Sequence, residues 1–388
     1  MPPQLLLDLT PLAATSALRG IGRYVRGLVQ GLTDVWHESS PNFEIRGLAA
    51  NRSLTALHRI DDLAAYCALP AARPPAAADA RRNWLITFAA PLSLRNSNTS
   101  LHLTDPKGMP IGRASRYTVT CHDIISLALP DLYLPPIPRW SRLVRQIERS
   151  RYLRARRILA VSQATRRDLV TVLGIPEDRI DVAWHGVDHA RFNVHAQPED
   201  AQRVHAALGA TEPYVLYVGA GDARKDLDTL LTAYAASRVQ REALLVVAGR
   251  LSGQRSQALR QLAKRLNVLN RVKLVGYLDE AIVPALYRRS RLHVFPSLYE
   301  GFGLPVIEAL ACGAPTITSP GSSLDEVAGD AARIVPCRDT EAMSHALEEV
   351  FYDEATRTLL RNRGLRRAKQ FTWQACAEAT LAFWRRSL

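Results

Sequence analysis

Apolar and polar positions alternate along the chain as short runs of Val, Ile and Leu separated by longer segments with helical spacing. In the first half, these runs predict strands at Gln4–Leu9, Phe43–Leu48, Ser100–Leu103, Tyr117–Cys121, Ile158–Val161 and Ile180–Ala183. In the second half they predict strands at Tyr214–Val218, Leu244–Ala248, Val272–Val275, Leu292–Phe295, Ala314–Thr318 and Arg333–Val335. Near-continuous apolar strands are typical of parallel sheets whose two faces are both covered by helices.

The segments between these strands include amphipathic stretches that predict helices at Arg23–Leu32, Arg139–Arg154 and Ala164–Leu173. Strands that alternate with helices predict an α/β fold with doubly wound sheets. Two such sets predict two Rossmann-like domains facing each other across a cleft. Polar residues replace the strand pattern between His195 and Thr211, so the predicted domains are residues 1–200 and residues 201–370.

Composition excludes several classes of protein. The 388 residues are 47% hydrophobic and 22% charged, which is ordinary for a globular protein and not for a disordered or fibrous one. No apolar run approaches the length of a membrane span, and the N-terminus lacks the basic region of a secretory signal. The five cysteines are scattered, as is typical of reduced thiols. We therefore expect a cytoplasmic protein.

The chain is strongly basic, with 50 Lys and Arg against 37 Asp and Glu and a formal net charge of +13. A surplus of this size favours anionic partners such as nucleic acid, an anionic membrane surface or a phosphorylated substrate. Composition alone does not choose among them, and a solvated basic surface without a partner is equally compatible.

The most specific motif places two glutamates around glycines, in the segment from Glu300 to Glu308 (Glu-Gly-Phe-Gly-Leu-Pro-Val-Ile-Glu). It follows a predicted strand and leads into an apolar helical segment. Glycines at the start of a helix expose backbone N–H groups that attract phosphate oxygens. The two carboxylates could bind a sugar ring and a ribose diol. A capped helix with a solvated Glu308 is the structural alternative.

In its full setting, from Phe295 to Pro315 and on through Gly321–Ala332, this segment resembles the family-4 glycosyltransferases. These are retaining enzymes with the two-domain GT-B fold, and their relatives include mannosyltransferases. The resemblance implies that Glu300 contacts the donor sugar and Glu308 the nucleotide ribose. It places Gly301, Phe302, Gly303 and Leu304 near the sugar and phosphates. It also implies a final helix, residues 371–388, that crosses back onto the N-terminal domain.

A second motif runs from a buried strand into the turn Gly219-Ala-Gly-Asp-Ala-Arg-Lys225. Its glycines allow a close backbone approach, and Arg224 and Lys225 can neutralise a diphosphate. A tight turn with solvated cations is the alternative. The segment is similar to the family's diphosphate-binding turn, but Ala220 stands where relatives often carry Arg. The resemblance implies donor binding by Arg224 and Lys225.

Two motifs in the first half carry less information on their own. Gly20 and Gly22 form only part of a dinucleotide fingerprint and could be a simple turn. His122 follows a predicted strand and could hydrogen-bond a hydroxyl or form a structural pair with Asp123. In the resembled family, a glycine loop here lies against the donor phosphates and acceptor, which implies roles for Gly22, Arg23 and His122.

The segment Arg139–Arg157 contains eight Arg and one acidic residue, Glu148. Apolar side chains recur in it at helical spacing, so it predicts a basic amphipathic helix. Such a helix can lie on anionic lipid headgroups, and it can equally pack its apolar side in the domain core.

The motifs together with the family resemblance imply a retaining glycosyltransferase that moves a hexose from a nucleotide sugar to a glycan or lipid-linked acceptor. The opening around Gly22 and the Arg-Lys turn are similar to those of surface-polysaccharide enzymes, which favours GDP-mannose as the first donor to test. Lys225, Glu300 and His122 are the predicted catalytic residues. We expect no metal, no cofactor and no nucleic-acid partner. A sugar-nucleotide epimerase of the same fold and a non-catalytic nucleic-acid or lipid-binding module are the alternatives.

Overall fold

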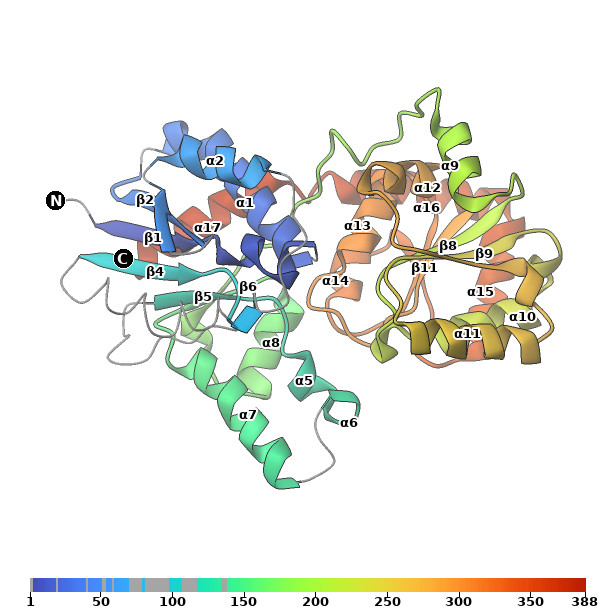
Figure 1. Cartoon of the computed structure of the whole chain (residues 1–388), viewed down its shortest axis with the longest axis horizontal. Coiled ribbons are helices and arrows are strands. Elements are labelled where there is room, and N and C mark those ends of the chain that lie inside the picture. The colour runs from blue at the N-terminus through green and yellow to red at the C-terminus, as the bar shows by residue number, and fades with distance from the viewer. Residues whose placement is uncertain are drawn as a thin grey trace. The chain divides into compact units, whose positions relative to one another are not determined.

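The computed structural model describes residues 3–18, 20–39, 41–50, 54–57, 59–69, 79–80, 98–106, 117–133 and 138–388. The chain divides into two compact units, residues 1–186 with 372–388, and residues 187–371. Each unit contains one sheet with helices on both faces (Figure 1). The predicted fold class is confirmed.

The first unit contains a sheet with the strand order β3-β2-β1-β4-β5-β6-β7. Its strands are β1 (Gln4–Asp8), β2 (Glu44–Ala50), β3 (Leu54–Leu57), β4 (Thr99–Leu103), β5 (Tyr117–Cys121), β6 (Ile158–Ala160) and β7 (Ile180–Val182). All neighbours pair in parallel except β3, which pairs antiparallel with β2. The six predicted strands are present within two residues at each end, and β3 was not predicted.

Alternate residues of β1 point to opposite faces of this sheet. Leu5 and Leu7 join a core with the helices α1 (Gly20–Ser39), α2 (Ile60–Ala68) and α17 (Trp373–Ser387). Leu6 joins a second core with α7 (Pro138–Leu153) and α8 (Gln163–Thr171). Two short helices, α5 (Ile125–Ala128) and α6 (Pro130–Tyr133), precede α7. Each helix layer therefore buries one side of the same strands.

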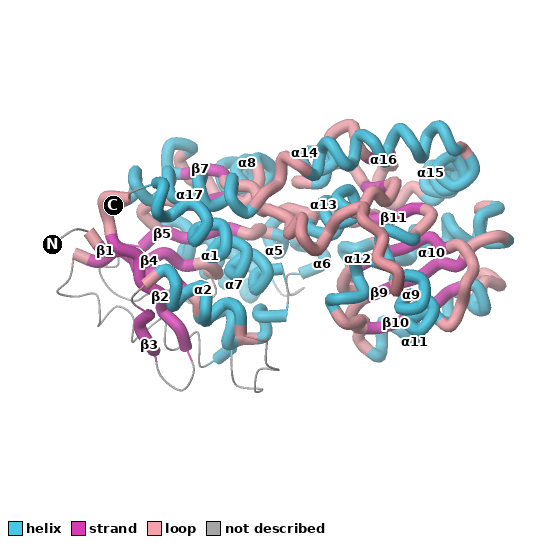
Figure 2. Tube along the Cα trace, turned by 90° about the horizontal axis from the view of Figure 1, so that it is seen from above, coloured by secondary structure: helices cyan, strands magenta, loops and turns pink. Residues whose placement is uncertain are grey.

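The last helix of the chain packs along the first long one, and both views show α17 beside α1 (Figure 2). Two glycines make this close approach possible. A Cβ atom on Gly27 would lie 2.1 Å from the Trp373 ring, and one on Gly31 would lie 2.1 Å from the Trp373 carbonyl oxygen. The terminal helix thus belongs to the first unit, as the family resemblance implied.

The second unit has a six-stranded parallel sheet with the order β10-β9-β8-β11-β12-β13. The strands are β8 (Tyr214–Val218), β9 (Leu244–Ala248), β10 (Val272–Gly276), β11 (Leu292–Phe295), β12 (Thr316–Thr318) and β13 (Ala332–Ile334). One face carries α10 (Leu227–Ala236), α11 (Gly253–Arg265) and α15 (Thr340–Tyr352). The other carries α12 (Val283–Arg289), α13 (Leu304–Ala311) and α16 (Glu354–Ala368). The short helices α9 (Asp200–Leu208) and α14 (Leu324–Ala328) complete the unit.

The units divide between Gly186 and Val187, earlier than the boundary predicted near residue 200. The polar composition after His195 suggested a linker there, but the preceding residues already pack within the second unit. Val187 N donates a hydrogen bond to Phe371 O (3.1 Å), and Arg191 pairs with Glu280 (3.0 Å). The contacts of residues 187–200 with the second unit, rather than their polar composition, therefore determine where the two units divide.

Candidate functional site

The turns that follow β8 and β11 meet at one edge of the second sheet. These strands are neighbours in the sheet although β9 and β10 lie between them in the sequence. Strand order reverses at this point, and ligands of doubly wound sheets bind beyond the carboxyl ends of the strands there. The turn after β8 supplies Arg224 and Lys225, and the turn after β11 supplies Glu300. The sequence motifs thus converge where the fold positions ligands.

The Lys225 side chain forms a buried ion pair with Glu300, with 2.6 Å between Nζ and Oε1. Arg224 approaches the other carboxylate oxygen, with Nη2 3.6 Å from Oε2, and its Nη1 is 2.8 Å from Asp222 Oδ2. Arg224 Nε also donates to the Tyr299 carbonyl oxygen (3.3 Å). Glu300 thus contacts both cations, and Arg224 is also held by Asp222 and the Tyr299 carbonyl oxygen.

Neighbouring side chains hold Glu300 in place. Ser297 donates a hydrogen bond to its carboxylate. The Glu300 backbone N–H donates to Ser322 Oγ (3.1 Å), and Ser323 Oγ donates to the Glu300 carbonyl oxygen (2.9 Å). None of these three serines was predicted to have a role, although all three lie inside the segments that resemble the family. Their contacts fix both the backbone and the carboxylate of Glu300.

The environment of this ion pair determines its charge state. Burial by itself raises the pKa of Glu300, but the charges of Lys225 and Arg224 and the hydrogen bonds from Lys225 and Ser297 bring it below its ordinary value. Burial lowers the pKa of Lys225, and the Glu300 carboxylate opposes that shift. Lys225 Nζ also lies 4.5 Å from the centre of the Phe295 ring, a favourable cation–π contact. Glu300 is therefore an anion at neutral pH.

The helix α13 begins directly after the glycines of the motif. Gly303 has φ +99°, a left-handed conformation, and a Cβ atom there would lie 2.8 Å from Leu324 Cδ2. In the first turn of α13, Pro305 has no N–H group and Val306 N donates to the Gly303 carbonyl oxygen (2.9 Å), so Leu304 carries the first backbone N–H of the helix. Gly301 and Phe302 are buried in the preceding turn. The positive end of the helix dipole at this start favours an anion.

Glu308 lies in the second turn of α13 with only 3% of its surface exposed. Tyr287 donates a hydrogen bond to Glu308 Oε2 (3.4 Å). Glu308 is thus buried in the same loop-and-helix element as Glu300, rather than solvated on the helix as the structural alternative required. Both carboxylates of the motif are therefore held by the fold.

The glycine turn after β8 is shaped by close backbone contacts. Gly249, which follows β9, has φ +135°, and a Cβ atom there would lie 1.9 Å from Gly219 O. Gly221 N donates to Arg250 O (3.2 Å). A side chain at Gly249 would displace the turn that carries Arg224 and Lys225. The glycines therefore position the cations.

His122 lies in the first unit, directly after β5. Its Nε2 is 2.8 Å from the Thr104 carbonyl oxygen, which can only accept, so Nε2 carries the proton and Nδ1 is the basic nitrogen of the neutral ring. Burial lowers the pKa of His122, partly opposed by this hydrogen bond and by Asp105 and Asp123. The Tyr24 ring lies edge-on at 4.9 Å, and the His185 ring is 5.6 Å away. His122 is thus a neutral, oriented side chain.

Gly22 and Arg23 occupy the first turn of α1 rather than a turn that directly follows β1. Two short 3₁₀ helices, Thr10–Ala13 and Thr15–Leu18, separate the strand from α1. Gly22 is buried, and a Cβ atom on it would lie 2.2 Å from Ala17 O. Arg23 is half-buried. A steric requirement explains the glycine, and the prediction of donor binding by Gly22 stays untested.

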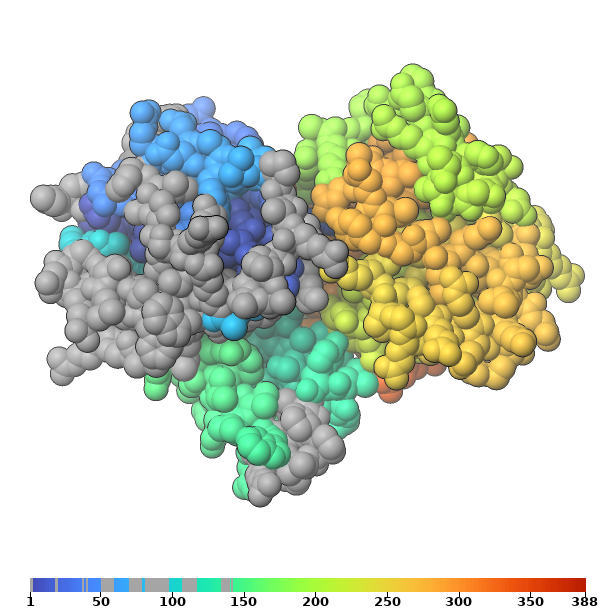
Figure 3. Space-filling view, in the orientation of Figure 1, coloured from blue at the N-terminus to red at the C-terminus, as the bar shows by residue number. Residues whose placement is uncertain are grey.

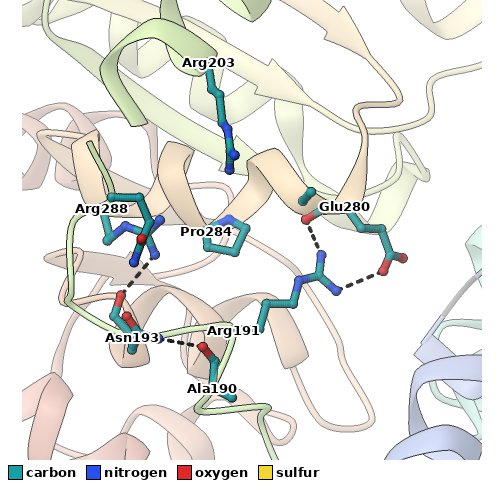
Figure 4. Close-up of a pocket in the computed structure, with 9 residues that line it drawn as sticks. Ala190, Arg191, Asn193, Arg203, Glu280, Pro284 and Arg288 are labelled. Atoms are coloured by element: carbon teal, nitrogen blue, oxygen red, sulfur yellow. Dashed lines mark hydrogen bonds and ion pairs between the residues drawn. The ribbon is translucent and has the colours of Figure 1, made fainter. Parts of the chain in front are cut away.

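A pocket of about 460 Å³ elsewhere in the second unit is lined by three arginines and Glu280 (Figure 4). Arg191 pairs with Glu280, and Arg288 forms two hydrogen bonds with Asp200 at 2.7 and 2.9 Å. The third, Arg203, points into the pocket from α9. The pair of Arg288 with Asp200 joins the segment after Val187 to α12, and the pair of Arg191 with Glu280 joins it to the short 3₁₀ helix Glu280–Ile282 before α12. These contacts explain why the segment belongs to the second unit.

The sequence is similar to families of known enzymes. Residues 199–367 match the family described as glycosyl transferases group 1, and residues 18–191 match glycosyltransferase family 4. O-antigen chain mannosyltransferase B of Escherichia coli is 32% identical over 274 residues, covering 69% of this chain and 70% of that protein. The serotype-specific mannosyltransferase WbdA of Escherichia coli is 28% identical over 67% of this chain, which spans only 32% of WbdA.

Solved structures share the fold across the whole chain. Sucrose-phosphate synthase of Thermosynechococcus elongatus has a TM-score of 0.73 with 21% identity, covering 100% of this chain and 99% of that one. HepE of Anabaena, solved with UDP and glucose, has a TM-score of 0.72 with 17% identity and covers 100% of both chains. No helix among the described residues combines the length and apolar character needed to cross a membrane.

Proposed function

Because this chain belongs to glycosyltransferase family 4 and has the GT-B fold, we propose that it transfers a hexose from a nucleotide sugar to a glycan or lipid-linked acceptor, with retention of anomeric configuration. The observation that carries the proposal is the buried cluster of Lys225, Glu300 and Arg224 at the point where strand order reverses. A site with two cations beside a helix start is suited to a diphosphate leaving group.

Breaking the anomeric carbon–oxygen bond leaves negative charge on the departing diphosphate. Lys225 uses one N–H on Glu300 and has two more for phosphate oxygens, and Arg224 adds a planar fork of donors. The amino-terminal end of α13 supplies further positive potential through the helix dipole. Because these groups are held before substrate arrives, they stabilise the developing charge without reorganisation. We propose that they serve without a metal ion.

The two glutamates receive separate roles in this proposal. Glu300, anionic and fixed by three serines, binds the hydroxyls of the donor sugar. Glu308 accepts the ribose hydroxyls of the nucleotide. In the first unit, we assign the acceptor to Arg23 and to His122, whose Nδ1 can accept a hydrogen bond from a hydroxyl. We also propose that Gly22 contacts the donor.

We propose mannose as the transferred sugar and GDP-mannose as the donor, in the biosynthesis of a surface polysaccharide. Similarity to O-antigen and serotype-specific mannosyltransferases supports this choice. The relatives also include an α-(1→4)-mannosyltransferase of Mycolicibacterium hassiacum, 27% identical over 72% of this chain. HepE, solved with UDP-glucose, is a structural neighbour with 17% identity, so UDP-sugars belong in the same screen.

We further propose that the protein works in the cytoplasm, at the inner face of the membrane, through Arg139–Arg157. Helix α7, which makes up most of this segment, exposes Trp140 (48%), Leu143 (43%) and Ile147 (41%) between its arginines. Apolar side chains next to cations favour the interface of an anionic bilayer. A lipid-linked acceptor would be presented at the same surface.

The function is tested with purified protein, a panel of nucleotide sugars and a lipid-linked glycan acceptor. We expect product formation with one donor, a rise in melting temperature with the matching nucleoside diphosphate, and the anomeric configuration of the donor in the product by NMR. Glu300→Gln and Lys225→Met should lower kcat at least ~100-fold. Lys264→Met, an exposed lysine on α11, serves as the matched control.

The alternatives give different outcomes in this experiment. Consumption of the nucleotide sugar with release of free sugar, in the absence of an acceptor, would favour an epimerase. Salt-sensitive binding of nucleic acid without any turnover would favour a binding module. Full activity in the presence of EDTA is expected, and its loss would overturn the metal-independent mechanism.

A further inference from the structure

A line of polar side chains crosses the apolar core of the first unit and ends at His122. Thr118 and Thr120 alternate along β5 and therefore lie on one face of the sheet, and His122 follows directly after the strand. His102, on the neighbouring strand β4, lies opposite Thr118 in the sheet register. His102 and the two threonines are at most 3% exposed, whereas His122 is half-buried. The line thus reaches the surface at the residue to which the sugar acceptor is assigned.

Tyr24 of α1 connects the helix layer to this line. Its hydroxyl oxygen lies 2.9 Å from Thr120 Oγ1, and Thr120 Oγ1 lies 3.0 Å from His102 Nε2. His102 Nδ1 is 2.8 Å from Thr118 Oγ1. Atoms of the dark blue N-terminal segment lie at the surface in Figure 3, but Tyr24 is only 1% exposed, so its side chain points into the core. These four side chains form one continuous chain of hydrogen bonds.

The donors in this chain follow from its first member. Thr120 is the one hydrogen-bond partner of the Tyr24 hydroxyl among the described residues, so the phenol proton is used only if Tyr24 donates. Thr120 then donates to His102 Nε2, and His102 Nδ1–H donates to Thr118. Burial raises the pKa of Tyr24 and lowers the pKa of His102 to about 3, so both side chains are neutral, as this assignment requires. Each group in the chain therefore helps to orient the next one.

The ring of Tyr24 also packs against His122. Its centre lies 4.9 Å from the centre of the His122 ring, with the two planes at 79°, and 4.9 Å from the centre of the His185 ring, with the planes at 29°. The His122 and His185 rings are 5.6 Å apart. His122 Nε2 donates to the Thr104 carbonyl oxygen. A hydrogen bond therefore holds one nitrogen of His122, and two rings restrict its rotation.

We propose that Tyr24 is a positioning residue for sugar transfer: with its hydroxyl anchored to Thr120, its ring holds His122 so that Nδ1 keeps one direction toward the acceptor hydroxyl. Polar groups inside an apolar core are costly unless they are connected, and the connection to His122 gives this line a use. Misplacing a substrate-binding group by about an ångström can cost ~100-fold in rate. The inference rests on the proposed function, because it assumes that His122 binds the sugar acceptor.

Steady-state kinetics of the full chain, with a nucleotide sugar and a lipid-linked glycan, separate positioning from support of the fold. Tyr24→Leu removes the ring and should lower kcat/KM for the acceptor at least ~10-fold, with the KM for the donor within ~2-fold of wild type. Tyr24→Phe keeps the ring and should restore most of that loss. Thr120→Val should match Tyr24→Phe, and the two changes together should lose no more than either alone, because both remove the same hydrogen bond.

The matched control is Tyr117→Phe, at the start of β5. Tyr117 is 2% exposed and belongs to the other core of the first unit, and its hydroxyl donates to the Arg151 carbonyl oxygen (3.0 Å). The variant loses a buried hydroxyl from the same strand, but it should leave the kinetic parameters of both substrates unchanged. An equal loss in Tyr117→Phe and Tyr24→Phe, or equal effects of Tyr24→Leu on acceptor and donor parameters, would show that Tyr24 only supports the fold.

NMR of the protein with ¹⁵N-labelled histidine rings tests the geometry without turnover. In the wild type we expect the proton on Nε2 of His122 and on Nδ1 of His102. Tyr24→Leu should give a mixture of both tautomers at His122, and Tyr24→Phe a mixture at His102, while Tyr117→Phe keeps the wild-type tautomers.

Wild-type tautomers in Tyr24→Leu would overturn the proposal. If that variant does not fold, Tyr24→Phe and Thr120→Val carry the test, and an unchanged His102 tautomer in both would contradict the anchoring bond. A wild-type protein that transfers no sugar would remove the proposed function, and the tautomers would still decide whether Tyr24 positions His122.

Discussion

The ion pair of Lys225 and Glu300 has a cost in folding stability and a proposed role in ligand binding. Both side chains are more than nine-tenths buried, and removing charges from water is costly even when they are paired. The serines around Glu300 and the ring of Phe295 beside Lys225 offset part of that cost. A buried ion pair of this kind lowers stability, and it lies beyond the carboxyl ends of β8 and β11, where ligands of such sheets bind. Ligand binding is therefore the best explanation for its presence.

The pair can be tested through stability alone. Removing one partner leaves the other buried without compensation, so Lys225→Met or Glu300→Gln should lower the free energy of unfolding of the second unit by ~3–5 kcal/mol. The variant that carries both substitutions should lose less free energy of unfolding than the two single variants lose together. Urea denaturation of the four proteins measures the coupling energy. Additive losses would contradict a direct interaction.

At the scale of single elements, Gly31 makes the packing of α1 on α17 possible. Helix propensity alone predicts that Gly31→Ala stabilises the helix by up to ~1 kcal/mol. The structure predicts the opposite sign, because the new Cβ atom would lie 2.1 Å from the Trp373 carbonyl oxygen, and backbone cannot move aside as a flexible side chain does. We expect a loss of ~1–3 kcal/mol from overpacking in thermal denaturation.

Gly253→Ala, at the start of α11, is the matched control, since nothing lies within 4 Å of its Cβ position. It should leave the melting temperature within about a degree or raise it slightly. A stabilising Gly31→Ala would show that α1 and α17 do not pack as described.

The elements also show what sequence can and cannot predict. Strands such as Tyr214–Val218 and Leu244–Ala248 are uninterrupted apolar runs, and their predicted bounds are those of the structure. The edge strand Leu54–Leu57 was missed because its Leu-Thr-Ala-Leu sequence is not a continuous apolar run. Glu300 and Lys225 were each found because the motif around each of them is local in sequence, although the two residues are 75 positions apart. Ser322 was not, because its hydrogen bond to Glu300 spans 22 positions.

For the whole molecule, acid sensitivity should differ between the two units. In the first unit, burial lowers the pKa of His102 to about 3 and also lowers those of His122 and His185. In the second unit it lowers the pKa of His293 to about 3. A histidine whose pKa is lower in the folded than in the unfolded protein takes up a proton on unfolding once the pH falls below its ordinary pKa of 6.5. The free energy of unfolding is therefore unaffected by that histidine above this pH and decreases progressively below it.

The expected result between about pH 4.5 and 6.5 is a steeper loss of stability in the first unit than in the second. Each proton taken up on unfolding contributes ~1.4 kcal/mol per pH unit. Hydrogen exchange followed by mass spectrometry, at pH 7 and at pH 5, resolves the two units by their peptides. We expect α1 and β5 to lose protection first and β8 to keep it longer. The reverse order would contradict the prediction.

His293→Phe provides the internal check on this mechanism. The His293 ring is fully buried, lies between Tyr287 and Phe295, and its two nitrogens have no hydrogen-bond partner among the described residues. An aromatic ring without nitrogens fits the same contacts and removes the unpaired polar atoms, which cost ~1–3 kcal/mol when buried. The variant should therefore be more stable at pH 7 and should flatten the acid response of the second unit while leaving that of the first unchanged. A response that stays the same in the second unit would mean that groups other than His293 control its acid stability.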